Sequence, residues 1–122
     1  MTRVDLIVPT YNGSDLLRAC LRSLRSSTFT DYQLWVVDDG STEPIATVVA
    51  KEAPGAEVIR FDSNVGLTRG LNAAIARGSA EFVVLLNNDT EVEREGLAWL
   101  VGWADGHPRG GGGGLKLGGV RD

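Results

Sequence analysis

The sequence has little of what several common kinds of site require. It contains one cysteine and one histidine among 122 residues. A single cysteine excludes an intrachain disulfide and a cysteine-rich zinc site. Cys20 falls on an apolar helical stripe, so we expect a buried core residue rather than a reactive thiol. His107 lies next to Pro108 in a glycine-rich tail, where we expect it to be exposed, so a Ser-His-Asp catalytic set is not expected.

Long apolar runs and an excess of positive charge are also missing. No apolar run approaches the ~20 residues that a membrane helix needs, and the N-terminus lacks the apolar stretch of a signal peptide. We therefore expect a cytoplasmic protein without a membrane span, with attachment at the inner membrane surface as an alternative. The chain has 12 Lys+Arg against 16 Asp+Glu, a net charge of −4, which argues against a nucleic-acid partner. A small anionic ligand stays possible, because a divalent cation can invert the local field.

The chain does have enough apolar residues, 43% of the total, to form one hydrophobic core. Its strand and helix patterns alternate along the sequence. This alternation predicts an α/β fold, Rossmann-like, with a mostly parallel sheet flanked by helices. We expect Ser14 or Asp15 to cap the first helix, and segment 57–61 to lie near a sheet edge. Trp99 and Trp103 are expected to pack or to contact a partner. Strands are expected at residues 4–9, 32–37, 57–61 and 82–86, and helices at 15–26, 44–52, 67–77 and 93–104.

The composition changes near residue 106. Residues 110–114 are five consecutive glycines, which fix little conformation. We therefore divide the chain into an α/β domain, residues 1–105, and a glycine-rich tail, residues 106–122. The tail is either a loose terminus or the start of a longer region.

The most informative stretch is the apolar run that ends at Asp38-Asp39-Gly40-Ser41. Its apolar part reads as a buried strand of a parallel sheet. Ligands of open parallel sheets bind just beyond the carboxyl ends of the strands. The two carboxylates therefore either serve a ligand or cap the turn and the next helix.

Two other strand ends should meet at the same edge. The first strand leads into Pro9-Thr10-Tyr11-Asn12, whose aromatic ring and hydroxyls suit a planar base. The fourth leads into residues 87–90, Asn-Asn-Asp-Thr, where one carboxylate beside amides suits Mg²⁺ or Mn²⁺. The alternative for this segment is a turn with a helix cap.

The loop 64–72 is a fourth polar element. Gly66 and Gly70 permit close backbone approach, and the helix start that follows can face an anion. Arg69 is either a phosphate ligand or a solvated surface residue. The sequence has neither a Gly-x-Gly-x-x-Gly dinucleotide turn nor a Gly-Lys-Ser/Thr phosphate loop.

Taken in order, these segments resemble family 2 glycosyltransferases of the GT-A fold, from about residue 4 to residue 95. The resemblance implies a UDP- or dTDP-sugar donor, with residues 9–12 lining the base pocket and Tyr11 against the ring. It implies that Asp39 accepts from the imide of uracil or thymine, that Asp38 is a less certain neighbour, and that Arg69 lies near the phosphates. The remaining implied nucleotide-binding residues are Pro9, Thr10, Asn12, Asn64, Gly66 and Asn88.

The chain departs from the family's Asp-x-Asp motif, because Asn87 stands where the first aspartate is usual. Asp89 is then the carboxylate left for a Mn²⁺ or Mg²⁺ cofactor, with Asn88 facing the ribose or metal-bound waters. The Asn-Asn-Asp-Thr version is similar to bacterial enzymes that transfer rhamnose. The resemblance also implies a further acceptor-binding region, for a saccharide or lipid-linked acceptor, and a general base that we do not find in this chain.

Two alternatives stay open at this point. A non-catalytic nucleotide-binding or structural homologue is consistent with Asn87, and it could dimerise through an exposed sheet edge. A receiver-like signalling domain also carries an acidic pair, but after its first strand rather than its second.

Overall fold

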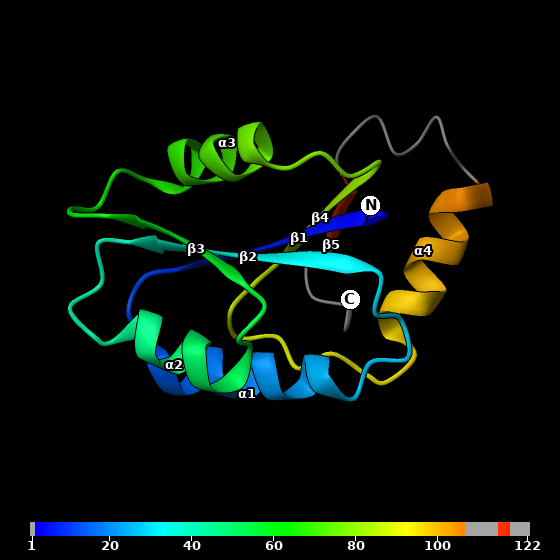
Figure 1. The fold of residues 1–122 in the computed structure, drawn as a ribbon, viewed down its shortest axis with the longest axis horizontal. Coiled ribbons are helices and arrows are strands. Elements are labelled where there is room, and N and C mark those ends of the chain that lie inside the picture. The colour runs from blue at the N-terminus through cyan, green and yellow to red at the C-terminus, as the bar shows by residue number, and fades with distance from the viewer. Residues whose placement is uncertain (1, 107–114, 118–122) are drawn as a thin grey trace.

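The computed structural model describes residues 2–106 and 115–117, which form a sheet with helices on both faces (Figure 1). The strands are β1 Val4–Thr10, β2 Tyr32–Asp39, β3 Glu57–Phe61, β4 Phe82–Leu86 and β5 Leu115–Leu117. The helices are α1 Ser14–Arg25, α2 Ile45–Glu52, α3 Leu67–Arg77 and α4 Gly96–Gly106. The expected Rossmann-like α/β fold is confirmed.

The five strands run in the order β3-β2-β1-β4-β5, and every pairing is parallel. The chain moves outward from β1 to β3 and then returns to the other side of β1 with β4. The strand order therefore reverses between β1 and β4, which is where open α/β sheets bind ligands. A receiver-type sheet has a different strand order, 2-1-3-4-5, so the topology does not support that alternative.

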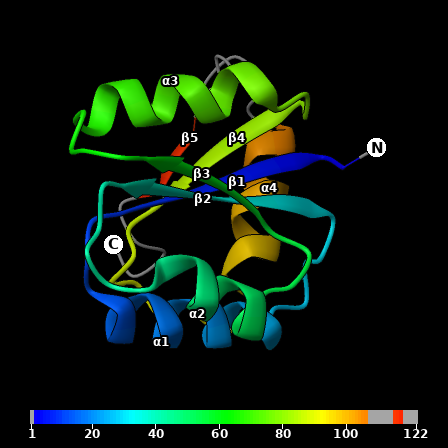
Figure 2. The same ribbon diagram turned by 60° about the vertical axis from the view of Figure 1, so that its left-hand side comes forward.

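The core has two parts, one on each face of the sheet. The larger part joins the sheet to α1, α2 and α4, and includes fully buried Leu6, Leu17 and Leu86. The smaller part lies under α3, where Trp35, Val37 and Ala74 are buried. Figure 2 shows α3 alone above the sheet, with α1 and α2 below it. Because all pairings are parallel, the carboxyl ends of the strands share one edge of the sheet, toward which β2 and β3 run at the left in Figure 1.

Several expected boundaries need correction. β2 continues through Asp38 and Asp39, which pair with Arg60 and Phe61 of β3, so the acidic pair ends the strand instead of following it. α1 begins at Ser14 after an N-cap Gly13 that makes no side-chain cap, so the expected cap by Ser14 or Asp15 is wrong.

Two further boundaries differ at the helices. α2 begins at Ile45, one residue after Pro44, and α4 begins at Gly96 rather than at residue 93. Three residues of the tail, Leu115–Leu117, form β5 beside β4. His107 lies outside the described residues.

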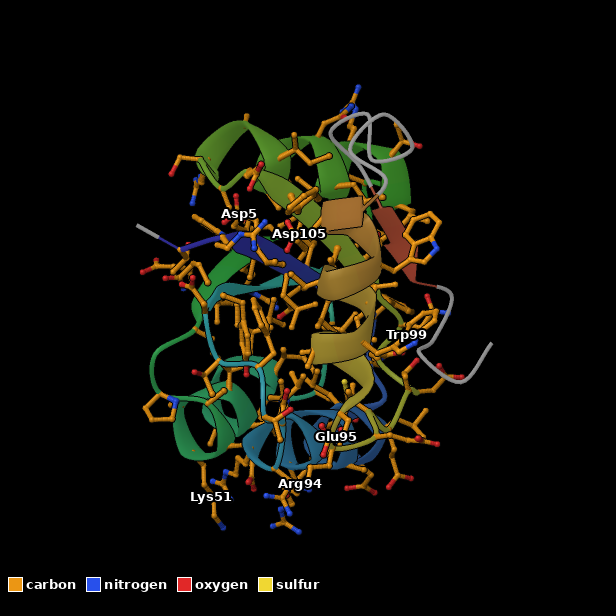
Figure 3. All side chains as sticks on the ribbon, turned by 90° about the vertical axis from the view of Figure 1, so that its right-hand side faces the viewer. Asp5, Lys51, Arg94, Glu95, Trp99 and Asp105 are labelled. Carbon is orange, nitrogen blue, oxygen red and sulfur yellow. The ribbon has the colours of Figure 1, made fainter. Side chains whose placement is uncertain are left out.

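The outer surfaces carry two other expected features. β3 is an edge strand, as expected for segment 57–61, and β5 forms the other edge of the described sheet. Trp99 is 69% exposed and projects outward from α4, instead of packing (Figure 3). Among the described residues, no helix combines the length and apolar character needed to cross a membrane.

Candidate functional site

A shallow hollow of about 310 Å³ opens at the carboxyl ends of β1, β2 and β4. It lies at the switch point between β1 and β4, where the sheet order reverses. Its lining consists of Pro9, Thr10, Tyr11, Asp39, Leu67 and Asn88. All of these except Leu67 are residues for which the sequence predicts nucleotide binding. The fold therefore brings together segments from three strand ends and from the start of α3.

Asp39 faces this hollow and also holds the loop that leads into α3. Its Oδ1 accepts a hydrogen bond from the Val65 amide at 2.7 Å, and its Oδ2 accepts one from the Gly66 amide at 3.1 Å. Each carboxylate oxygen can accept more than one hydrogen bond. Asp39 is half-buried, so it retains acceptor capacity toward the hollow while its carboxylate plane is fixed.

Asp38 points to the other side of the strand and does not line this hollow. Its side chain is 1% exposed, accepts from the Ser41 amide at 3.0 Å, and pairs with Arg60 Nη1 at 2.6 Å. Successive residues of a strand face opposite sides of the sheet, which separates the two neighbouring carboxylates. In this structure Asp38 anchors the turn after β2, and the nucleotide contact predicted for it has no support from its position.

Asn12 joins the β1–α1 turn to the β2–α2 loop. Its backbone adopts a φ of +54°, and its amide donates to Ser41 Oγ at 2.7 Å. Its side-chain Oδ1 accepts from the Thr42 amide and hydroxyl and from the Glu43 amide. The side chain therefore positions the turn that carries Tyr11, and its oxygen is used within the fold instead of facing the hollow.

Glu43 occupies the N-terminus of α1 from across the loop. Its carboxylate accepts from the Gly13 amide at 3.3 Å and from the Ser14 amide and hydroxyl at 2.9 and 2.6 Å. The bonds from Ser14, and then from Gly13, lower the pKa of the Glu43 carboxyl. The Glu43 carboxylate thus occupies the amides at the start of α1, so a ligand phosphate cannot bind them.

Gly40 allows the turn after β2 to lie against the β3–α3 loop. Its φ is +78°, and a Cβ there would lie 2.6 to 2.9 Å from backbone atoms of Ser63 and Asn64. No side chain fits at that distance, so the acidic turn and the loop can approach only with glycine at this position. Asn64 is itself exposed.

The end of β4 supplies the oxygen-rich part of the site. Asn88 donates from Nδ2 to Thr10 Oγ1 at 2.9 Å, which leaves its Oδ1 for a ligand and links the ends of β4 and β1. Asp89 follows it and is exposed. No group of three or more His, Cys, Asp or Glu side chains that could hold a metal occurs in residues 2–106 and 115–117. One carboxylate and an amide oxygen suit a hard divalent cation that takes its other ligands from water and substrate phosphates.

The start of α3 faces the same edge, and the amide of its N-cap Gly66 donates to Asp39. Gly66, with a φ of +92°, is the N-cap and makes no side-chain cap. The first-turn amides that follow it have no intrahelical acceptor and carry the positive end of the helix dipole. Arg69 lies in this first turn and is exposed, but it does not line the hollow.

A second hollow, of about 260 Å³, lies between α1 and α2 near the start of β2. Its walls include buried Leu21 and Leu24, and its carboxylate, Glu52, is ion-paired with three arginines of α1. The hydrogen bond from Arg22 lowers the pKa of the Glu52 carboxyl, so this charge is compensated within the fold. The carboxyl edge of the sheet is therefore the candidate functional site.

Sequence reasoning missed two residues of this region. Glu43 acts on α1 across about thirty residues of sequence, and no local spacing marks that contact. Leu67 lies within the polar loop 64–72 and begins the predicted helix, but the sequence does not mark it as a residue that lines the hollow.

Comparison with known proteins gives the family. The sequence model of "Glycosyl transferase family 2" matches residues 5–113. The chain is 29% identical over 105 residues to GalNAc(5)-diNAcBac-PP-undecaprenol beta-1,3-glucosyltransferase of Campylobacter jejuni, covering 83% of this chain and 34% of that protein. It is 30% identical over 112 residues to poly(ribitol-phosphate) beta-N-acetylglucosaminyltransferase TarS of Staphylococcus aureus, covering 88% of this chain and 20% of TarS.

Solved structures agree with this result. A crystal structure of S. aureus TarS 1-349 in complex with UDP-GlcNAc superposes with a TM-score of 0.77 at 28% identity, covering 88% of this chain and 32% of that one. The mannosyltransferase PcManGT of Pyrobaculum calidifontis, in complex with GDP-Man and Mn²⁺, gives a TM-score of 0.76 at 28% identity, covering 84% of this chain and 32% of that one. The chain spans about a third or less of these proteins. The matched sequence and the shared fold show that this chain belongs to glycosyl transferase family 2.

Proposed function

We propose that the hollow at the carboxyl edge binds the nucleoside diphosphate of a nucleotide sugar, and that residues 1–105 are the donor-binding part of an inverting, metal-dependent glycosyltransferase. One observation carries this proposal. A hollow at the β1/β4 switch point combines a fixed acceptor carboxylate, Asp39, an exposed aromatic ring, Tyr11, and the side-chain oxygen of Asn88.

The base would be recognised by Asp39. A carboxylate only accepts hydrogen bonds, so it selects a ring with an N–H at its edge, such as the imide of uracil or thymine. Guanine also offers a ring N–H, whereas adenine offers only its exocyclic amine, because its ring nitrogens accept. Tyr11, which is 55% exposed, would stack on the ring face. A UDP or dTDP donor is therefore favoured, and the TarS complex with UDP-GlcNAc supports the first.

The diphosphate would lie between Asp89 and the start of α3. Asp89 and Asn88 would hold the divalent cation, which supplies positive charge that stabilises the leaving nucleoside diphosphate. The helix start and Arg69 would add a second positive field, since the start of α1 is already occupied by Glu43. The Mn²⁺ in the PcManGT complex supports a cation at such a site.

Transfer itself needs groups beyond this hollow. An inverting displacement requires a general base within hydrogen-bond reach of the acceptor hydroxyl, and the sequence offers no candidate for it. We therefore expect this chain to bind donor but to transfer sugar poorly on its own. Residues 106–122 would begin the region that binds a saccharide or lipid-linked acceptor. Transfer of rhamnose, a cytoplasmic location and oligomerisation through a sheet edge stay predictions.

Titration calorimetry with UDP, dTDP, GDP and ADP, each with and without Mn²⁺, tests the proposal. We expect binding of UDP or dTDP that is strengthened by Mn²⁺, and weaker binding of ADP, which shares the diphosphate but lacks a ring N–H for Asp39. Asp89→Asn should remove the Mn²⁺ effect, while Glu91→Gln, a charge change two residues further on, should retain it. Nucleotide affinity that is the same with and without Mn²⁺ would favour the non-catalytic homologue. The absence of binding to any of the nucleotides would contradict the proposal.

A further inference from the structure

The apolar stripe of α3 continues beyond the edge of the sheet. Leu67, Gly70, Leu71 and Ala74 recur at helical spacing, so they lie on one side of the helix. Gly70 and Ala74 are buried and Leu71 is partly buried, because this side packs on β1 and β2. Leu67, the first residue of the stripe, is 57% exposed and lines the hollow. Its apolar surface is therefore presented where the strands have ended.

Leu67 has a counterpart in Tyr11. Both are large apolar side chains, both are more than half exposed, and both line the same hollow from different elements, α3 and the β1–α1 turn. A single exposed leucine is ordinary on a protein surface. Here two such side chains line one concave site, and the Asp39 carboxylate lies at the end of a strand between their elements. The site therefore combines two apolar walls with one hydrogen-bond acceptor.

The position of Leu67 is fixed by its neighbours. Asp39 bonds the amides of the two preceding residues, Val65 and Gly66. Gly70 lets α3 lie close to β2, since a Cβ there would be 2.8 Å from Val37 Cγ1. A wall that is held in place before binding loses little entropy when a ligand arrives.

We propose that Leu67 is a specificity-determining residue that contacts the base on the face opposite Tyr11. This inference rests on the proposed function and adds to it. Affinity should depend on a flat ring held between Leu67 and Tyr11, in addition to the diphosphate and the cation. A ligand that carries the diphosphate without a base would gain nothing from Leu67.

The test compares two probes, UDP and pyrophosphate, each titrated with Mn²⁺ into the wild-type chain and into Leu67→Ala. The variant should bind UDP about tenfold more weakly, the effect of losing contact with roughly half of a leucine side chain. Its affinity for pyrophosphate should stay within about twofold. Leu67→Met, which replaces leucine with an apolar side chain of similar size, should retain most of the UDP affinity.

Ile75→Ala provides the matched control, because Ile75 is 48% exposed on the same helix but does not line the hollow. It should leave both affinities unchanged, and circular dichroism should show all variants folded. Wild-type UDP binding with an unchanged affinity in Leu67→Ala would overturn the inference alone. An equal loss for UDP and pyrophosphate would also overturn it. A wild-type chain that does not bind UDP would overturn the proposed function and this inference together.

Discussion

The adjacent residues Asp38 and Asp39 should respond in opposite ways to the same substitution. Both are carboxylates at the end of β2, but Asp38 is buried against Arg60 and Asp39 lines the hollow. Replacing each by asparagine retains size and shape and removes only the charge and one acceptor. We expect Asp38→Asn to lower stability and Asp39→Asn to lower nucleotide affinity.

The magnitudes follow from the hydrogen bonds. In Asp38→Asn the amide oxygen can serve only one of the Ser41 amide and the Arg60 guanidinium. A lost hydrogen bond to a charged group costs about 1.5–3 kcal/mol. Arg60 is 47% exposed and can be rehydrated, so we expect about 2 kcal/mol. For a domain of this size that lowers Tm by roughly 8 °C.

In Asp39→Asn one of the two loop amides loses its acceptor, but the site is open to water. We expect a smaller loss of stability, about 1 kcal/mol. The asparagine would present an N–H, or a neutral oxygen, to the base instead of a carboxylate. Loss of that charged acceptor should weaken UDP binding between roughly tenfold and a hundredfold. Asp38→Asn should bind UDP within about threefold of wild type.

Thermal denaturation and UDP calorimetry on both variants check this prediction. Equal losses of affinity would show that the two carboxylates act as one site. A larger loss of UDP affinity for Asp38→Asn than for Asp39→Asn would refute the proposal that Asp39 accepts the hydrogen bond from the base.

Two further changes test the supports of the site. Gly40→Ala should lower the free energy of unfolding, measured by chemical denaturation, by about 3 kcal/mol, because the residue has a φ of +78° and its Cβ would lie 2.6 Å from backbone. Gly55→Ala, whose Cβ would have nothing within 4 Å, should change it by no more than about 0.5 kcal/mol. Equal losses for the two variants would refute the close approach at Gly40. Glu43→Gln should lower Tm at pH 7. The pKa of Glu43 is held below its ordinary 4.5, so its stabilisation is present above that pH and lost as the pH falls through the folded pKa. The Tm difference between wild type and variant should therefore narrow below about pH 4.5, and a constant difference would contradict the capping role of the charge.

Much of the fold could be predicted from the sequence, because buried parallel strands and amphipathic helices leave clear patterns. β3, α3 and β4 have the predicted bounds, and the acidic turn reaches the expected edge. The opposite facing of Asp38 and Asp39 also follows from strand periodicity, once β2 is taken to end at Asp39 rather than Val37.

What could not be predicted depends on contacts between distant segments. The bond of Glu43 to the start of α1 joins the β2–α2 loop to another element, and neither segment signals it alone. Leu67 lies on a visible stripe, but its exposure depends on where the strands beneath α3 end. The use of the Asn12 oxygen within the fold likewise depends on the Thr42–Glu43 backbone.

The most direct test of the account is a map of the nucleotide on the chain. Addition of UDP and Mg²⁺ to the ¹⁵N-labelled protein should shift backbone amide signals at Tyr11, Asp39, Gly66, Leu67 and Asn88. Signals of Leu21, Leu24 and Ala53, around the hollow between α1 and α2, should stay unchanged. Shifts confined to that second hollow, or no shifts at all, would contradict a nucleotide site at the carboxyl edge of the sheet.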